Sequence, residues 1–188
     1  YAERITVVQG LSTEHVPAQK ADVIVSDIRG SLPLFEHHIA TIVDARERLL
    51  APGGTLIPMR DTIRAALVQH PDGYLSREEP WLRNNYSLDL SAGHRYAVNT
   101  WSKVSLQPEQ LQSESVELAV LDYRTITNPN MSGTVTLHAD KDGTAHGLLL
   151  WFDADLAPGI GYSNAPGQPK LVYGQSFFPF ERPLTLAK

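Results

Sequence analysis

Hydrophobic and polar positions along the first third of the chain predict alternating strands and helices. Two apolar runs, Ile5–Val8 and Ala21–Ser26, are rich in β-branched residues, which is typical of strands covered on both faces of a parallel sheet. Apolar residues then recur at helical spacing between Phe35 and Leu50, before the sequence A-P-G-G at 51–54, which favours the end of a helix. The pattern therefore predicts strand, loop, strand, helix and a further strand that begins at Thr55.

From residue 61 onward, short apolar or alternating runs are separated by clusters of Gly, Pro, Asn and Asp. This pattern is typical of antiparallel β structure. The sequence D-K-D-G at 140–143 predicts a hairpin turn between the apolar runs 133–137 and 147–152, and 108–112 is the one stretch that favours a helix. We expect an α/β + β chain, with part of an open parallel sheet over 1–60 and an antiparallel β-barrel or sandwich domain over 61–188.

Two acidic residues flank the loop in the sequence S-D-I-R-G-S-L-P-L-F-E at 26–36. Asp27 follows a predicted strand, and open α/β sheets bind ligands beyond the carboxyl ends of their strands. Glu36 comes nine residues later, in the expected first turn of the helix. Two carboxylates in one cleft could exchange protons, bind a metal or hold a cation such as a guanidinium. A structural alternative is that Asp27 caps a turn and Glu36 complements the helix dipole.

Composition narrows the class of protein. The 188 residues include no cysteine, which excludes disulfides, thiolate nucleophiles and cysteine-bound zinc. A net charge of -5 argues against a nucleic-acid partner. No apolar run approaches the roughly 18 residues of a membrane span, so we expect no membrane partner and a cytoplasmic protein. The seven histidines are scattered without a metal-ligand spacing, and no metal is expected. A metal-dependent hydrolase that uses Asp27, Glu36 and His38 is the least favoured alternative.

Three stretches together resemble the protein arginine methyltransferase family. They are A-D-V-I-V-S-D at 21–27 with Gly30 and Glu36, then A-R-E-R-L-L-A-P-G-G-T-L-I-P at 45–58, and the strands at 147–153 and 174–180. In that family a strand ends in Ser-Glu, and a second Glu stands nine positions after the first. The resemblance implies the C-terminal half of a Rossmann-like class I methyltransferase sheet over 1–60. It also implies a β-barrel substrate-binding domain over 61–188, with a dimerisation arm at about 72–91 that holds Trp81 and Tyr86.

The resemblance implies methyl transfer from S-adenosyl-L-methionine to an arginine in a protein or peptide, by a homodimeric enzyme. A guanidinium is a poor nucleophile because its charge is delocalised. Two carboxylates can concentrate that charge and hold one nitrogen in line with the methyl group. Asp27 and Glu36 occupy the positions of the family's two catalytic glutamates. Ser12 and Thr13 lie in a loop that resembles the adenine-contacting loop, and His38 stands where many members have a methionine near the cofactor.

The sequence departs from the family pattern in the acidic loop. The first acid is Asp rather than Glu, and Ile28-Arg29 replaces the usual Trp-Met. Leu171-Val172-Tyr173 replaces the Thr-His-Trp loop. Arg29 could pair with one carboxylate and weaken the pair, so the alternative is a catalytically weak relative that acts as a protein-binding module. No G-x-G-x-x-G occurs. We therefore expect a piece of a longer protein that, alone, is inactive and binds S-adenosylmethionine weakly.

Overall fold

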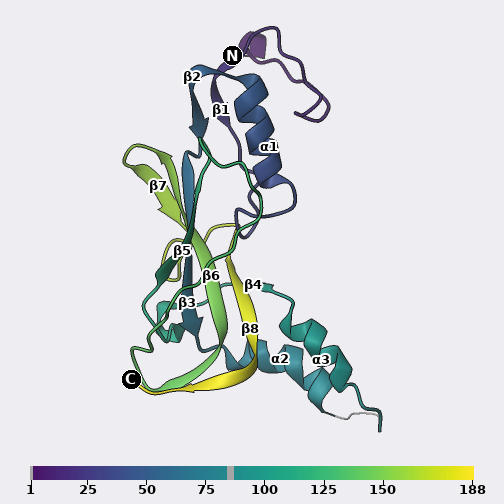
Figure 1. Ribbon diagram of the computed structural model, residues 1–188, viewed down its shortest axis with the longest axis vertical. Coiled ribbons are helices and arrows are strands. Elements are labelled where there is room, and N and C mark those ends of the chain that lie inside the picture. Colours follow the sequence, from purple (N-terminus) through teal and green to yellow (C-terminus); the bar gives the residue numbers. More distant parts are fainter. Residues whose placement is uncertain (1, 84–86) are drawn as a thin grey trace.

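The computed structural model describes residues 2–83 and 87–188. Tyr86 of the predicted arm lies outside the described residues. The molecule is elongated, with a parallel strand pair and its helix at one end, a long antiparallel sheet in the middle and a projecting pair of helices at the other end (Figure 1). Within the described ranges, no helix is both long and apolar enough to cross a membrane.

A strand–helix–strand unit forms the N-terminal end. The parallel strands are β1 (Ala21–Val25) and β2 (Leu50–Ile57), and helix α1 (His38–Asp44) with the π-helical segment η2 (Ala45–Leu49) connects them. The predicted order strand, helix, strand is found, but the second strand begins at Leu50 rather than Thr55, so that A-P-G-G lies within β2. The helix begins at His38 rather than Phe35. The reason is that Glu36 has a left-handed backbone with φ of 44°, which a continuous right-handed helix does not allow.

Two expectations about the first strands are wrong. Ile5–Val8 forms no strand, and its side chains are exposed beyond a short 3-10 turn, η1 (Ala2–Arg4). We also expected the second strand to be covered on both faces, but Val23 and Val25 of β1 are 52% and 71% exposed. Among the described elements, β1 pairs only with β2, which leaves one side of it open.

The larger sheet is antiparallel, as predicted. Its strands follow the order β4-β8-β6-β3-β5, with β7 paired to β6. The bounds are β3 (Arg60–Val68), β4 (Ser102–Val104), β5 (Val116–Asp122), β6 (Gly143–Ala157), β7 (Ile160–Ser163) and β8 (Gln175–Leu186). The described strands form an open sheet, because no pairing joins β4 to β5. The predicted hairpin at 140–143 is wrong, since 133–137 is irregular and β6 pairs instead with β3, β7 and β8.

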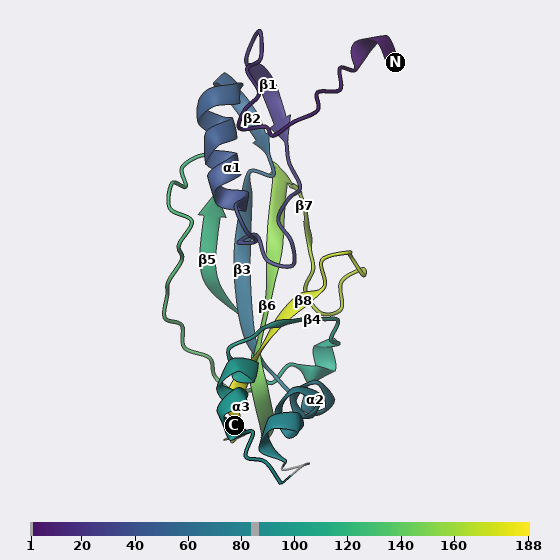
Figure 2. The same ribbon diagram turned by 90° about the vertical axis from the view of Figure 1, so that its right-hand side faces the viewer.

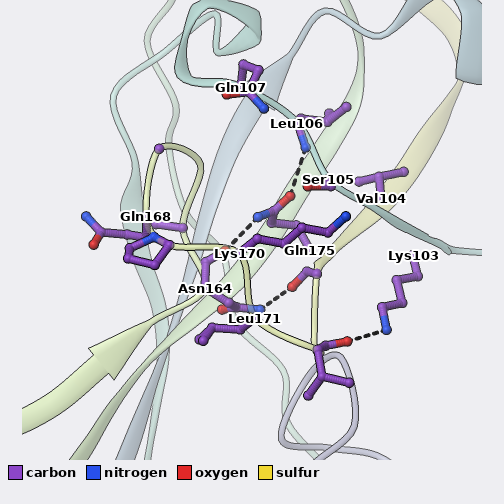
Figure 3. Close-up of a pocket in the computed structure, with 15 residues that line it drawn as sticks. Lys103, Val104, Ser105, Leu106, Gln107, Asn164, Gln168, Lys170, Leu171 and Gln175 are labelled. Carbon is purple, nitrogen blue, oxygen red and sulfur yellow. Dashed lines mark hydrogen bonds between the residues drawn. The ribbon is translucent and has the colours of Figure 1, made fainter.

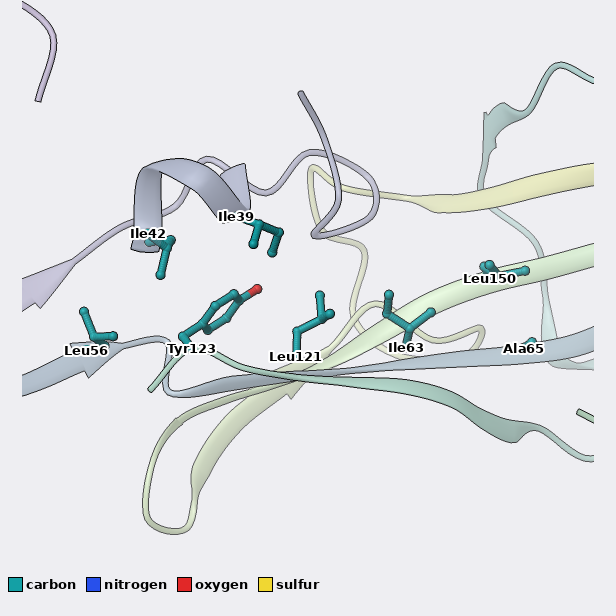
Figure 4. Close-up of a cluster of buried hydrophobic side chains, with 8 residues drawn as sticks. All are labelled: Ile39, Ile42, Leu56, Ile63, Ala65, Leu121, Tyr123 and Leu150. Atoms are coloured by element: carbon teal, nitrogen blue, oxygen red, sulfur yellow. The ribbon is translucent and has the colours of Figure 1, made fainter. Parts of the chain in front are cut away.

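The helix packs on the start of the antiparallel sheet. Ile39 and Ile42 of α1 are 3% exposed and contact a cluster that spans both sheets. Figure 4 shows this cluster, whose other members are Leu56, Ile63, Ala65, Leu121, Tyr123 and Leu150. Burial of such side chains contributes roughly 1.5–3 kcal/mol each. Leu32 and Leu34 of the acidic loop between β1 and α1 also pack against this cluster, which anchors the loop.

Two helices that the pattern did not predict form the projecting end, as Figure 2 also shows. They are α2 (Pro71–Leu82) and α3 (Ser91–Val98), within and just beyond the predicted arm at 72–91. Trp81 packs tightly on α3, because a Cβ at Gly93 would lie 2.0 Å from its ring. Gly73 and Pro80 inside α2 weaken its helical pattern. The stretch at 108–112 forms only a 3-10 turn, η3 (Pro108–Gln110).

Candidate active site

The acidic loop brings Asp27 and Glu36 to one pocket. Ser26 N donates to Ile57 O at 2.9 Å, so Asp27 leaves the sheet at the carboxyl end of β1. Gly30 has φ of +68°, and a Cβ there would lie 2.8 Å from Phe35 Cβ, so the loop closes on itself. Asp27, Glu36 and His38 line a pocket of about 490 Å³, together with Ile28, Gly30, Phe35, His37 and Thr41.

The Glu36 carboxylate is open to a ligand. Its side chain is exposed, and no described residue makes a hydrogen bond or ion pair with it. Left-handed backbone in a non-glycine residue costs about 1 kcal/mol or more and is concentrated at functional sites. The strain and the free carboxylate are both consistent with a residue that binds a cation.

The Asp27 carboxylate, in contrast, is engaged by the protein itself. Its Oδ1 accepts from Nε and Nη2 of Arg29, both at 3.3 Å. Its Oδ2 accepts from the hydroxyl of Tyr173 at 2.5 Å. The side chain is still 57% exposed. Asp27 therefore faces the pocket with both oxygens already hydrogen-bonded.

Arg29 lies in a cage of acidic and aromatic side chains, with a side chain that is only 2% exposed. Its Nη1 donates to Asp61 Oδ1 at 2.9 Å, and its Nη2 also donates to the Tyr162 hydroxyl. The guanidinium carbon lies over the rings of Phe152, Tyr162 and Tyr173, at 5.2, 5.3 and 5.7 Å from their centroids. Burial alone would lower the pKa of Arg29, but Asp61, the tyrosines and Asp27 outweigh it and raise that pKa.

A buried chain of hydrogen bonds continues from the cage to His38. Tyr123 donates to Asp61 Oδ2 at 2.5 Å, and the Tyr123 oxygen lies 3.0 Å from His38 Nε2. Because the tyrosine proton goes to Asp61, we assign the proton of the imidazole to Nε2. His38 Nδ1 is then a buried lone pair with no partner among the described residues. Burial and, secondly, the Arg29 charge lower the pKa of His38 to about 4, so the ring is neutral at pH 7.

The predicted cofactor residues lie in two separate places. His38 lines the pocket of the two acids. Ser12 lines a different pocket, formed by residues 6–16, and Thr13 lies on the same exposed loop. Arg48 fixes this loop to η2, since it donates to Ser12 O at 2.7 Å and to His15 O at 2.5 Å. The structure therefore does not bring Ser12 and Thr13 beside Asp27 and Glu36. All three contacts stay predictions.

The hydrogen-bonding capacity of His38 fits a position near a cofactor. His38 lines the pocket of the two carboxylates, and its neutral imidazole has one unpartnered nitrogen, Nδ1. This nitrogen can accept a hydrogen bond, but it is buried, so a ligand reaches it only if neighbouring atoms move. Ser12 offers an exposed hydroxyl, which fits a polar contact less specifically.

Hydrogen bonds between residues that line a second pocket position Tyr173. This pocket has a volume of about 520 Å³ and lies between β4 and the loop before β8 (Figure 3). Gln175 accepts from Leu106 N at 3.0 Å and donates to Asn164 O at 2.7 Å. Asn164 accepts from Phe152 N at 2.8 Å and donates to Gly174 O. These bonds hold both ends of the loop, and Tyr173 consequently stays against Asp27.

The sequence did not single out Asp61, Tyr123, Tyr162 or Phe152 as parts of the site. Asp61 is the one acid in a mainly apolar strand, which is a weak indication of a buried partner. No three His, Asp or Glu side chains within 2–83 and 87–188 come together in a way that could hold a metal.

Solved structures share this fold. A Trypanosoma brucei structure described as the PRMT1 enzyme-prozyme heterotetrameric complex with AdoHcy superposes with a TM-score of 0.89 and 21% identity, over 97% of this chain and 59% of that chain. Protein arginine methyltransferase 10 of Arabidopsis thaliana, described as uniquely open, gives a TM-score of 0.77 at 20% identity, over 96% of this chain and 61% of that one. The fold is therefore that of the arginine methyltransferases.

Sequence comparison shows the family. A family profile described as the arginine methyltransferase oligomerization subdomain matches residues 60–188, so the chain belongs to the arginine methyltransferase family, as its sequence indicated. Protein arginine N-methyltransferase 1 of Dictyostelium discoideum is 25% identical over 96% of this chain and 54% of that protein. Protein arginine N-methyltransferase 2 of Mus musculus is 29% identical over 98% of this chain and 44% of that protein. The chain thus spans about half the length of these relatives.

Proposed function

We propose that the protein containing this chain transfers a methyl group from S-adenosylmethionine to an arginine guanidinium in a protein or peptide. One observation carries the proposal: Asp27 and Glu36 line the same pocket at the carboxyl end of β1. The names of the relatives and the AdoHcy of the Trypanosoma brucei complex support the cofactor and the reaction class.

Each residue has a chemical part in this proposal. S-adenosylmethionine supplies an electrophilic methyl group when bound. Glu36, whose carboxylate is free, attracts the positive charge of the guanidinium and leaves one terminal nitrogen more nucleophilic. Asp27, which lines the same pocket, limits the orientation of that nitrogen. His38 lines this pocket and, with Ser12 and Thr13, remains a proposed cofactor contact.

The test is a methylation assay with the full-length protein, an arginine-rich peptide and labelled S-adenosylmethionine. We expect methylarginine in the product, and we expect its rate of formation to fall at least tenfold in Glu36→Gln and Asp27→Asn. Asp22→Asn is the matched control, because Asp22 is an exposed carboxylate on β1 itself. Label on another residue type, or methylarginine that is unaffected by both active-site variants, would contradict the proposal.

A second candidate is a catalytically weak, protein-binding subunit. The observation that favours it is that Arg29 and Tyr173 already occupy both oxygens of Asp27. The same assay separates the two candidates. A weak subunit would give no methylarginine on its own while still binding an arginine peptide or a partner chain.

We further propose the finer architecture that the resemblance implies. The parallel pair β1–β2 would continue into a Rossmann-like sheet, and the open antiparallel sheet would close into a β-barrel, with strands from the rest of the protein. The α2–α3 arm would join two copies in a homodimer, and the match to an oligomerization subdomain supports self-association in general. We also propose a cytoplasmic location. Light scattering of the full-length protein tests the homodimer, and a monomeric mass would refute it.

A further inference from the structure

We propose that Arg29 is a built-in occupant of a guanidinium site at Asp27, and that, of the two carboxylates Asp27 and Glu36, it leaves Glu36 free to hold an acceptor arginine. Arg29 thereby sets the acceptor specificity. The inference rests on the proposed function in one respect, namely that Asp27 and Glu36 face the acceptor.

The cage around Arg29 has the chemistry that recognises an arginine side chain. It offers two carboxylates and a phenol oxygen to the guanidinium, which makes four hydrogen bonds with them. Three aromatic rings surround the same group. Carboxylate forks and aromatic faces are the two features that bind a guanidinium better than an ammonium. Arg29 therefore occupies a guanidinium site of the protein's own, which shares Asp27 with the pocket of Glu36.

A buried ion pair holds Arg29 in the cage. Its partner Asp61 is 0% exposed, so withdrawal of Arg29 would leave a carboxylate buried without a countercharge, which is strongly unfavourable. The Tyr123 hydroxyl is also bound to Asp61. The free-energy cost of separating Arg29 from Asp61 therefore opposes its displacement by an acceptor arginine.

Arg29 also weakens Asp27 as a ligand for the acceptor. Its charge lies 3.3 Å from Asp27 Oδ1 and repels a second guanidinium at the same carboxylate. A bidentate contact needs both oxygens of a carboxylate, and at Asp27 one is bound to Arg29 and the other to Tyr173. Glu36 has no such competitor among the described residues.

The test measures binding rather than turnover. In the full-length protein, Arg29→Met removes the guanidinium from the cage, and Arg29→Met with Asp61→Asn does so without leaving a buried charge. Arg60→Met is the matched control, because it removes an arginine from an exposed pair with Asp155 in the same sheet. Calorimetry with an arginine-containing peptide, in the presence of S-adenosylhomocysteine, gives Kd for each protein. A peptide with lysine in place of arginine shows whether the guanidinium is the group that is bound.

We expect the double variant to bind the arginine peptide at least tenfold more tightly than the unmodified protein. The lysine peptide and the Arg60→Met control should change less than threefold. A gain of less than threefold for the arginine peptide in the double variant, with the fold intact by circular dichroism, would overturn the inference.

The outcome is separable from that of the proposed function. If the double variant binds the arginine peptide more tightly but neither protein forms methylarginine, the inference stands and the proposed reaction fails. If the unmodified protein forms methylarginine readily and the affinity does not change, the reaction stands and the role of Arg29 is refuted.

Discussion

The buried pair between Arg29 and Asp61 gives the most direct prediction about stability, and Asp61→Ala is the perturbation. Asp61 is 0% exposed and accepts hydrogen bonds from Arg29 at 2.9 Å and Tyr123 at 2.5 Å. The variant leaves the Arg29 charge with only Asp27 as a countercharge, and Tyr123 without its acceptor. Both groups stay buried, so water does not replace the lost partner.

The magnitude follows from burial. Removal of one partner from a buried ion pair costs about 3–5 kcal/mol. A buried hydroxyl that loses its partner costs about 1–3 kcal/mol, although Tyr123 remains in contact with His38, so the two costs do not simply add. We expect a loss of about 4 kcal/mol in the free energy of unfolding. With a slope of about 2 kcal/mol per molar urea, this moves the midpoint down by roughly 2 M.

Urea unfolding of the full-length protein, followed by circular dichroism, measures the change. Asp155→Ala is the matched control, because Asp155 pairs with Arg60 at 2.5 Å but is 47% exposed. An exposed pair contributes about 0–1 kcal/mol. Arg29→Met with Asp61→Asn should recover most of the loss, since no unpaired charge remains. Equal effects of Asp61→Ala and Asp155→Ala would refute the argument from burial.

Three further predictions concern other parts of the chain. Because the pKa of His38 is lowered to about 4, the unfolded chain takes up its proton first, and stability falls by about 3 kcal/mol as pH decreases from about 6.5 to about 4. His38→Leu should remove this component in urea unfolding at several pH values. Gly147→Ala should destabilise the sheet by about 1–3 kcal/mol or more, because a Cβ there would lie 2.2 Å from Phe178 O. Leu88→Asp, at a side chain that is 59% exposed in the arm, should reduce the oligomeric mass in light scattering.

Each of these predictions has a matched control. His37→Leu changes an exposed neighbour of His38 and should keep the pH dependence. Gly133→Ala should be tolerated, since the nearest atom to its Cβ would be 3.4 Å away. Leu184→Asp, at a side chain that is 48% exposed on β8, should keep the mass. Each prediction is refuted if its variant and its control give the same result in the same measurement.

Local patterns predicted the order strand, helix, strand of the β1–α1–β2 unit, because β-branched runs and helical spacing act over a few residues. They also placed Asp27 and Glu36 at the ends of one loop. They misplaced the boundary between the helix and the second strand, since A-P-G-G lies within β2 rather than in a turn. The prediction of a strand at Ile5–Val8 was wrong, because β propensity does not produce a strand without a neighbouring strand to pair with. Helix α2 was missed because Gly73 and Pro80 interrupt its pattern.

The cage around Arg29 depended on contacts between residues that are far apart in the chain. Arg29 and Asp61 are 32 positions apart, and Arg29 and Tyr162 are 133 apart. No pattern within a single strand or helix encodes such a pairing. The sequence indicated that Arg29 could pair with one of the two carboxylates, and the contact with Asp27 agrees with this. The contacts of Arg29 with Asp61 and the aromatic rings became apparent only in the structure.

A crystal structure of the full-length protein with S-adenosylhomocysteine and an arginine peptide would show directly where the acceptor binds. We expect the peptide guanidinium in the pocket of Asp27 and Glu36, within about 3 Å of a Glu36 oxygen, while Arg29 remains bound to Asp61. A peptide guanidinium bound elsewhere, with Glu36 turned to solvent, would contradict this expectation.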